Sequence, residues 1–195
     1  MEFNHLLELA EKQKNTGNNE EAIKICEKIL CSDLGCHEAL EEIGDNYLSL
    51  RDYNKAEKAL IHALKINPYS ANANYLLGFV YSAIEQWDES VIFLERADKI
   101  HPNHPEILRC LGWSIFHSTD RKKGIIILER ALHLNRTDCL IMSDLGLCYL
   151  NEKNFNKATQ LFNSILKIEP DNEKAKECLK TTDFFKVEYE KLKKI

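Results

Sequence analysis

The sequence predicts an all-α solenoid of five helix hairpins, each 34 residues long, followed by one capping helix. A small residue recurs every 34 positions, at Ala10, Gly44, Gly78, Gly112 and Gly146. Helix breakers are scarce, with seven glycines and four prolines in 195 residues, and 29% of the residues are charged. Helical units that repeat at this period bury their apolar faces by stacking on one another.

Residues of one type also recur every 34 positions at other places in the repeat. The position before the small residue is always apolar, and these residues are Leu9, Ile43, Leu77, Leu111 and Leu145. Twelve positions after it, the residue is again small: Ala22, Ala56, Ser90, Gly124 and Ala158. Within one unit, the apolar residues fall at helical spacing. We therefore expect two helices of about 14 residues per unit, with the small residues letting their backbones approach closely.

The predicted units are residues 3–36, 37–70, 71–104, 105–138 and 139–172, and residues 173–195 are the predicted capping helix of a single domain, 1–195. Polar residues that favour helix N-caps precede most of the expected helices. They are Asn18, Asp52, Asp120 and Asn154 for second helices, and Ser70, Asp138 and Asn172 for others. Pro105 fits the first turn of a helix, where its missing N–H needs no partner.

This pattern resembles the tetratricopeptide repeat family over about residues 3–172. The small residues at repeat positions 8 and 20 carry the resemblance, together with a proline at position 32 in three units: Pro68, Pro102 and Pro170. Leu34 and Arg136 replace that proline in the first and fourth units. The resemblance implies a right-handed superhelical α-solenoid whose first helices line a concave groove for partner peptides.

Composition narrows the class of partner. The net charge is −5 overall, with −7 in residues 1–50 and +2 in residues 51–195. A nucleic-acid-binding protein normally carries a basic stripe, so we expect no nucleic-acid partner. The longest apolar run, residues 124–128, is too short to cross a bilayer, so we expect no membrane insertion. The N-terminus has no basic segment followed by an apolar one, which favours a cytoplasmic protein.

By the family resemblance, positions 2, 5, 9 and 12–13 of each first helix line the groove. The predicted peptide-binding residues are Glu11, Glu41, Asp45, Asn72, Tyr75, Phe79, Arg109, Trp113 and Phe116. This groove would be acidic at its N-terminal end and aromatic in the middle, which suits a protein or peptide segment with basic and apolar residues. In the alternative interpretation, the position-9 residues Phe79, Trp113 and Leu147 pack between first helices and the acidic cluster is a solvated face.

Some members of the family hold a chaperone's C-terminal carboxylate with lysine, asparagine and arginine side chains. Leu7 and Glu11 stand at the first two of the matching positions here. Because a carboxylate would meet like charge there, the sequence argues against this role.

The sequence predicts no catalytic residues, no metal site and no cofactor. Cys31, Cys36 and His37, even with Cys26, lack the second cysteine pair of a typical zinc site. The seven cysteines are expected to be small buried apolar residues of a reducing compartment. No glycine-rich phosphate loop and no paired carboxylates are evident.

The leading functional prediction is therefore a scaffold or adaptor that binds a partner in its groove. A second hypothesis is a self-associating scaffold that forms homo-oligomers through its C-terminal helix, where Phe184, Phe185 and Val187 are more apolar than a cap requires. A third is a tether for an enzyme carried by another chain. An enzyme in its own right is the least favoured interpretation.

Overall fold

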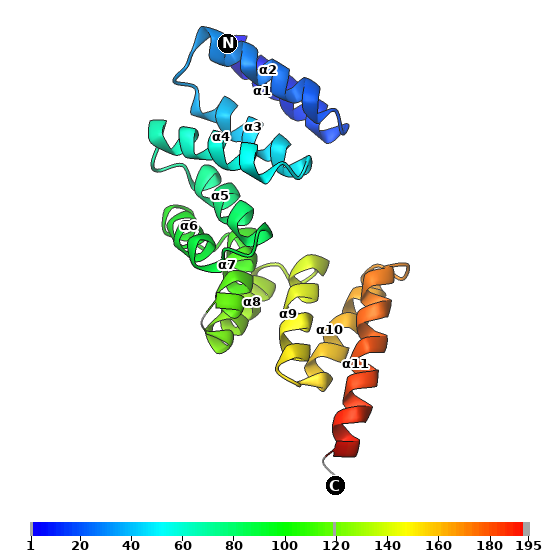
Figure 1. Cartoon of the computed structure of the whole chain (residues 1–195). Coiled ribbons are helices and arrows are strands. Elements are labelled where there is room, and N and C mark those ends of the chain that lie inside the picture. Colours follow the sequence, from blue (N-terminus) through cyan, green and yellow to red (C-terminus); the bar gives the residue numbers. More distant parts are fainter. Residues whose placement is uncertain (1, 119, 193–195) are drawn as a thin grey trace. The chain divides into compact units, whose positions relative to one another are not determined.

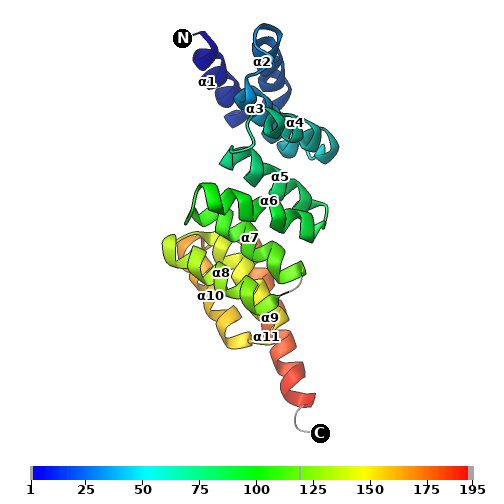
Figure 2. The same ribbon diagram turned by 90° about the vertical axis from the view of Figure 1, so that its left-hand side faces the viewer.

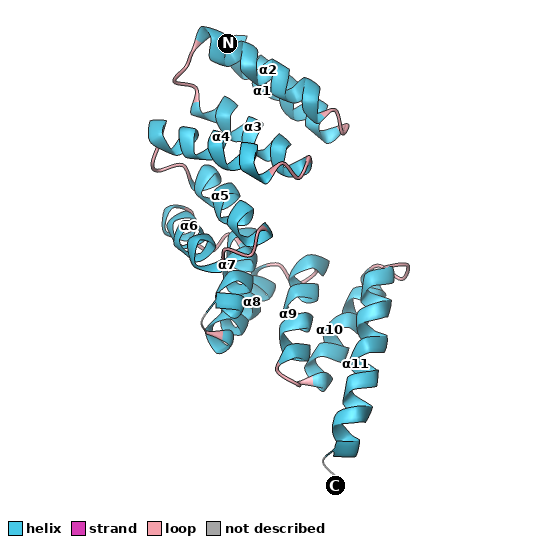
Figure 3. Cartoon of the chain, in the orientation of Figure 1, coloured by secondary structure: helices cyan, strands magenta, loops and turns pink. Residues whose placement is uncertain are grey.

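The computed structural model describes residues 2–118 and 120–192, and these residues form α-helices and no strand (Figure 3). The helices are α1 (Glu2–Asn15), α2 (Asn19–Ser32), α3 (His37–Ser49), α4 (Tyr53–Ile66), α5 (Ala71–Ala83), α6 (Trp87–Ile100), α7 (Pro105–Ser118), α8 (Arg121–Leu134), α9 (Cys139–Asn151), α10 (Phe155–Ile168) and α11 (Glu173–Leu192). The predicted all-α hairpin fold is confirmed.

The chain divides into two compact units, Met1–Pro102 and Asn103–Ile195. The N-terminal unit contains the hairpins α1–α2, α3–α4 and α5–α6, and the C-terminal unit contains α7–α8, α9–α10 and the single helix α11 (Figure 1). Within each unit, every helix packs on the next one along the chain. That the two units make one domain over residues 1–195 stays a prediction.

Small residues are required where the two helices of a hairpin cross. A Cβ atom on Gly44 would lie 2.6 Å from Cγ of Leu60 in the partner helix. The α7–α8 crossing is tighter, because a Cβ atom on Gly124 would lie 2.7 Å from the carbonyl oxygen of Gly112 and from the backbone nitrogen of Phe116. The 34-residue recurrence of small residues thus records backbone contact between paired helices.

The turn inside each hairpin also repeats. Gly17, Arg51, Glu85 and Lys153 occupy the same repeat position, and all four have positive φ angles between 58° and 82°. This left-handed conformation satisfies the carbonyls at the end of the first helix, but it costs a residue with a side chain about 1–2 kcal/mol. The corresponding residue of the fourth repeat, at position 119, lies outside the described residues.

Six of the seven predicted N-caps accept a backbone N–H from the first turn of their helix: Asp52, Asp120, Asn154, Ser70, Asp138 and Asn172. Asn18 is the N-cap residue of α2, as predicted, but its side chain makes no cap hydrogen bond, and its amide donates to Gln13 Oε1 at 3.0 Å and to Thr16 Oγ1 at 3.2 Å. The helix α7 begins at Pro105, as predicted.

The last helix, α11, has 20 residues, whereas the ten repeat helices have 13 or 14. Its first half buries Ala175 and Thr182, and it packs mainly on α10. Its C-terminal turns project beyond the α9–α10 turn in both views (Figures 1 and 2). Among the described residues, no helix combines the length and apolar character needed to span a bilayer.

Candidate functional site

The candidate surface is the face formed by the first helices of the hairpins. In the N-terminal unit α1 contacts α3 and α3 contacts α5, and in the C-terminal unit α7 contacts α9. In the described part of the N-terminal unit, the second helices α2 and α4 make no such contact. A stack whose first helices lie closer together bends toward them. We call this side of α1, α3 and α5, and of α7 and α9, the inner face of each unit.

On the inner face of the N-terminal unit, Lys14 of α1 joins two carboxylates of α3. Its Nζ atom lies 3.1 Å from Glu42 Oε2 and 2.7 Å from Asp45 Oδ2. Burial opposes the charged form of Lys14, but hydrogen bonds and charges from Asp45 and Glu42 outweigh it and raise the pKa of Lys14. Asp45, a predicted binding residue, therefore already has a cation as its partner.

Glu41 joins α3 to α5. This side chain is only 7% exposed, and it accepts hydrogen bonds from Ser70 Oγ at 2.6 Å and from Asn72 Nδ2 at 2.8 Å. Its burial corrects the expectation that Glu41 faces a ligand directly, because the next repeat covers it. Asn72 is exposed apart from this bond. The hydrogen bond between Glu41 and Asn72 holds α3 against α5. A partner on the inner face would contact the exposed Asn72 and not the buried Glu41.

The remaining predicted residues of this unit are accessible to different degrees. Glu11 is exposed, Tyr75 is half-buried and Phe79 is 36% exposed. They contribute one carboxylate and two aromatic rings to the inner face. The N-terminal inner face therefore presents less free negative charge than the sequence suggests.

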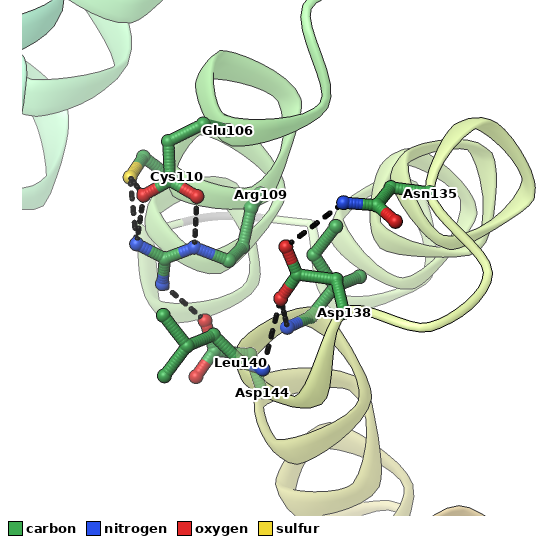
Figure 4. A network of polar contacts seen from close by, with 8 residues as sticks. Glu106, Arg109, Cys110, Asn135, Asp138, Leu140 and Asp144 are labelled. Atoms are coloured by element: carbon green, nitrogen blue, oxygen red, sulfur yellow. Dashed lines mark hydrogen bonds and ion pairs between the residues drawn. The ribbon is translucent and has the colours of Figure 1, made fainter. Parts of the chain in front are cut away.

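In the C-terminal unit, Arg109 of α7 occupies the same repeat position as Glu41. Its guanidinium donates to Glu106 Oε1 at 2.5 Å and Oε2 at 3.0 Å, and to Asp144 Oδ2 of α9 at 2.6 Å (Figure 4). The side chains of Arg109 and Asp144 are only 13% and 19% exposed. Burial opposes the charge of Arg109, but Glu106, Cys110 and Asp144 outweigh it and raise its pKa above the usual value. This arrangement is a buried clamp between two repeats, next to the Asp138 cap of α9.

Trp113 and Phe116 have different environments. Trp113 is half-buried and lies against the ring of His117, with centroids 4.4 Å apart. Phe116 is only 4% exposed and packs in a core cluster with Leu128 and Met142. Its expected place on the ligand-facing surface is therefore corrected, since the close approach of α8 at Gly124 encloses it.

The apolar part of the C-terminal inner face continues along α9. Leu147 and Leu150 are half-buried on the same cluster, and Leu140 is 62% exposed. The predicted peptide-binding residues do not include these three leucines, although they stand at repeat positions 2, 9 and 12, which the family resemblance assigns to the groove. Lys14 also stands at such a position, whereas Asp144 does not, and oppositely charged residues on successive first helices were a signal for both in the sequence.

The thiols offer little chemistry. Cys31 is exposed, which corrects the expectation that all seven cysteines are buried, whereas Cys26, Cys110 and Cys148 are buried. Burial raises the pKa of Cys26 to about 12, so that thiol stays protonated. Within residues 2–118 and 120–192, no three His, Cys, Asp or Glu side chains come together as a metal site.

Comparison with known proteins gives consistent matches. Models described as tetratricopeptide repeat match residues 47–112 and 141–172, together about half of the chain. Anaphase-promoting complex subunit 3 of Schizosaccharomyces pombe is 28% identical over 97 residues, which are 50% of this chain and 15% of that protein. The BBSome complex member BBS4 of Bos taurus is 24% identical over 160 residues, 82% of this chain and 30% of that protein. The chain thus spans less than a third of the length of either relative.

Solved structures share the fold. The structure of the APC/C hetero-tetramer Cut9–Hcn1 superposes with a TM-score of 0.85 at 18% identity, over 91% of this chain and 35% of that chain. YrrB, described as a TPR protein with an unusual peptide-binding site, superposes with a TM-score of 0.69 at 20% identity, over 90% of each chain. At these identities the matches establish the architecture of stacked helix hairpins.

Proposed function

Because this chain belongs to the tetratricopeptide repeat family, we propose that it is a protein–protein interaction scaffold in which the inner face of each unit binds a segment of a partner. The fold itself supports the general role of a scaffold for protein partners. YrrB, which shares the fold, is a protein with a peptide-binding site. The proposal assigns this chain no catalytic step and no cofactor.

The observation that carries the proposal is the apolar inner face of the C-terminal unit. Trp113, Leu147 and Leu150 are each half-buried on one core cluster, and Leu140 is well exposed beside them. Half-buried aromatic and aliphatic side chains on a rigid helical layer make effective anchors, because their rotamers are already restricted before binding. We propose that they contact apolar side chains of the partner.

The inner face of the N-terminal unit is a separate and more polar surface. Asn72, Tyr75 and Phe79 offer one amide and two aromatic rings, and Glu11 offers a carboxylate. This surface suits a partner segment that carries a basic residue beside apolar ones. Asp45 is already paired with Lys14, so a basic residue of the partner would have to share this carboxylate with Lys14. We therefore assign Asp45 a secondary role in binding.

The test is selection of binding peptides from a displayed random library, followed by titration of the chain with the selected sequences. We expect Trp113→Ala and Leu147→Ser each to weaken binding by at least about tenfold, as for hot-spot residues. The control is Ile126→Ser on α8, which removes an equally apolar side chain that is 63% exposed. Circular dichroism checks that each variant is folded. Unchanged affinity in both inner-face variants would refute the proposal.

A second candidate function is self-association. It is favoured by the exposed apolar residues of α11, since Phe184 is 62% exposed, and Phe185 and Val187 are each 51% exposed. Such a cluster on a surface helix marks a contact with another protein surface.

A further inference from the structure

A pocket of about 450 Å³ lies where the end of α11 passes the turn between α9 and α10. Its lining residues are Leu150, Asn151, Lys153, Phe155, Phe185, Glu188, Tyr189 and Leu192. The rings of Phe155 and Tyr189 meet at 5.7 Å between centroids and fix one wall. The helix α11 is longer than the repeat helices, and its last turns form one side of the pocket while the α9–α10 turn forms the other.

The rim of this pocket carries a cation. The ammonium of Lys153 lies 5.3 Å from the centroid of the Tyr189 ring. Glu188 also lines the pocket, but its carboxylate is paired with Lys191 at 2.7 Å. A ligand with an apolar side chain beside a carboxylate therefore complements this pocket in both shape and charge.

The N-terminal unit presents such a group in the loop between α2 and α3. Leu34 is 77% exposed at the tip of this loop. The loop is held as a tight turn, because Asp33 Oδ1 accepts the N–H of Gly35 at 2.8 Å and Asp33 O accepts the N–H of Cys36 at 3.3 Å. Asp33 and Glu38 flank the leucine, although Glu38 is also 2.8 Å from His37 Nδ1.

Charge also distinguishes this loop from its counterpart in the next repeat. Tyr69 is 80% exposed between α4 and α5, but residues 67–72 include no charged side chain. Overall, residues 1–102 carry 18 acidic and 10 basic side chains, a net charge of −8. Residues 103–195 carry 13 acidic and 16 basic side chains, a net charge of +3. Opposite net charges favour contact between the N-terminal unit of one copy and the C-terminal unit of another.

We propose that the pocket beside α11 binds the Asp33–Glu38 loop of a second copy of this chain, with Leu34 inserted between Phe155, Phe185 and Leu192. This inference deepens the second candidate function and rests on it. The contact joins two different surfaces, so each copy keeps one free pocket and one free loop. Contacts of this heterologous kind extend into rings or filaments.

The test is sedimentation velocity with light scattering over a range of protein concentrations. The wild-type chain is expected to form species larger than a dimer as concentration rises, and added salt is expected to shift them toward monomer. Leu34→Asp and Phe185→Ser should each weaken association by at least about tenfold. Lys153→Gly removes the cation while leaving a residue suited to positive φ, and should weaken association mainly at low salt.

The most specific test of the proposed contact is to mix two variants that each lack one side of it. A variant without Leu34 keeps its pocket, and a variant without Phe185 keeps its loop, so an equimolar mixture should form a one-to-one dimer and nothing larger. Tyr69→Ser and Ile126→Ser, which remove comparably exposed apolar groups elsewhere, should associate like the wild type. Circular dichroism confirms that each variant is folded.

The remaining outcomes overturn the inference in distinguishable ways. Association that persists in Leu34→Asp and Phe185→Ser would leave self-association standing but place it on another surface. A wild-type chain that stays monomeric at all concentrations would refute both this contact and self-association, and would leave binding on the inner faces untouched. Variants that are monomeric alone but do not pair when mixed would refute the proposed loop-in-pocket contact.

Discussion

The two units place charged side chains at related positions of their first helices, but the surroundings of these charges differ. In the N-terminal unit, Lys14 forms ion pairs with both Glu42 and Asp45, and the three side chains are 20% to 34% exposed. In the C-terminal unit, Arg109 and Asp144 are enclosed more deeply and are joined by Glu106. Both clusters join the first helices of two successive repeats, but the first stays more exposed and sets the charge of a surface, whereas the second is largely enclosed.

This difference shows how a repeat protein limits the charge it offers to a partner. A carboxylate on one first helix is available only if the neighbouring first helix does not neutralise it. Asp45 and Glu41 are both acidic in the sequence, yet one is paired with a lysine and the other is buried by Ser70 and Asn72. On the inner face of the C-terminal unit, Trp113, Leu147 and Leu150 are half-buried and not enclosed, so we expect a partner to make its main apolar contacts there.

The largest expected effect comes from breaking the buried clamp. Asp144→Ala should lower the free energy of unfolding of the C-terminal unit by about 3 kcal/mol, because it leaves a buried guanidinium with Glu106 alone. Urea denaturation followed by circular dichroism measures this loss. Replacing both Arg109 and Asp144 with leucine should recover most of it, since both deeply buried charges are gone and the remaining Glu106 side chain is 32% exposed to solvent.

A surface pair provides the control for that measurement. Arg121 and Glu152 lie 3.1 Å apart, but their side chains are 59% and 36% exposed. Glu152→Ala should therefore cost no more than about 1 kcal/mol. If Asp144→Ala and Glu152→Ala cost the same, the clamp is not a distinct structural element.

A smaller stability effect, with a gain in binding, is expected from Lys14→Gln. The cluster of Lys14, Glu42 and Asp45 is partly exposed, with side chains 20% to 34% accessible, so we expect its loss to cost about 1 kcal/mol of folding free energy. Removal of Lys14 uncovers Glu42 and Asp45, so a lysine-rich peptide should bind the N-terminal unit about fivefold more tightly at low salt. Isothermal titration measures the change. Lys12→Gln removes the same charge from an exposed residue on the same helix and should produce less of this gain.

The same cluster has a defined pH dependence. The pKa of Lys14 is raised in the folded chain, so its contribution to stability is fully present below the ordinary lysine value. That contribution is lost only as the pH rises through the raised value. The effect of Lys14→Gln on unfolding should therefore be constant across neutral pH, and a loss of the effect near neutrality would contradict the pairing.

The fold was predictable because its determinants are local and periodic. The helices α3, α7 and α9 begin at His37, Pro105 and Cys139, the first residues of three predicted units. Small residues at helix crossings and polar residues at N-caps act within one hairpin, so the 34-residue phase carries them directly. Asn18 takes the N-cap position as predicted but makes no side-chain cap bond, and its amide donates to Gln13 at the end of α1.

The site was less predictable because it depends on contacts between repeats. Phe116 shares a repeat position with half-buried residues of the other units, but Gly124 lets α8 approach closely enough to enclose it. Those half-buried residues are Lys14, Leu48, Ser82 and Leu150. The burial of Glu41 depends on its hydrogen bonds with Ser70 and Asn72, which lie about 30 positions further along the chain. The pocket beside α11 depends on how far that helix extends past α10, and helix propensity alone does not define this end.

The smallest expected effects concern helix caps, and they compare the two units once more. Asp138 accepts the N–H groups of Leu140 at 2.9 Å and Ile141 at 3.0 Å, whereas Asn18 makes no cap bond. Asp138→Ala should therefore cost about 1 kcal/mol of unfolding free energy, and Asn18→Ala only a few tenths of that amount. Urea denaturation of both variants measures the difference, and Asp138→Ser should restore most of the loss because a serine hydroxyl can accept the same bond. Equal losses at Asn18 and Asp138 would show that the α2 cap forms in solution, and the two units would then use their N-caps alike.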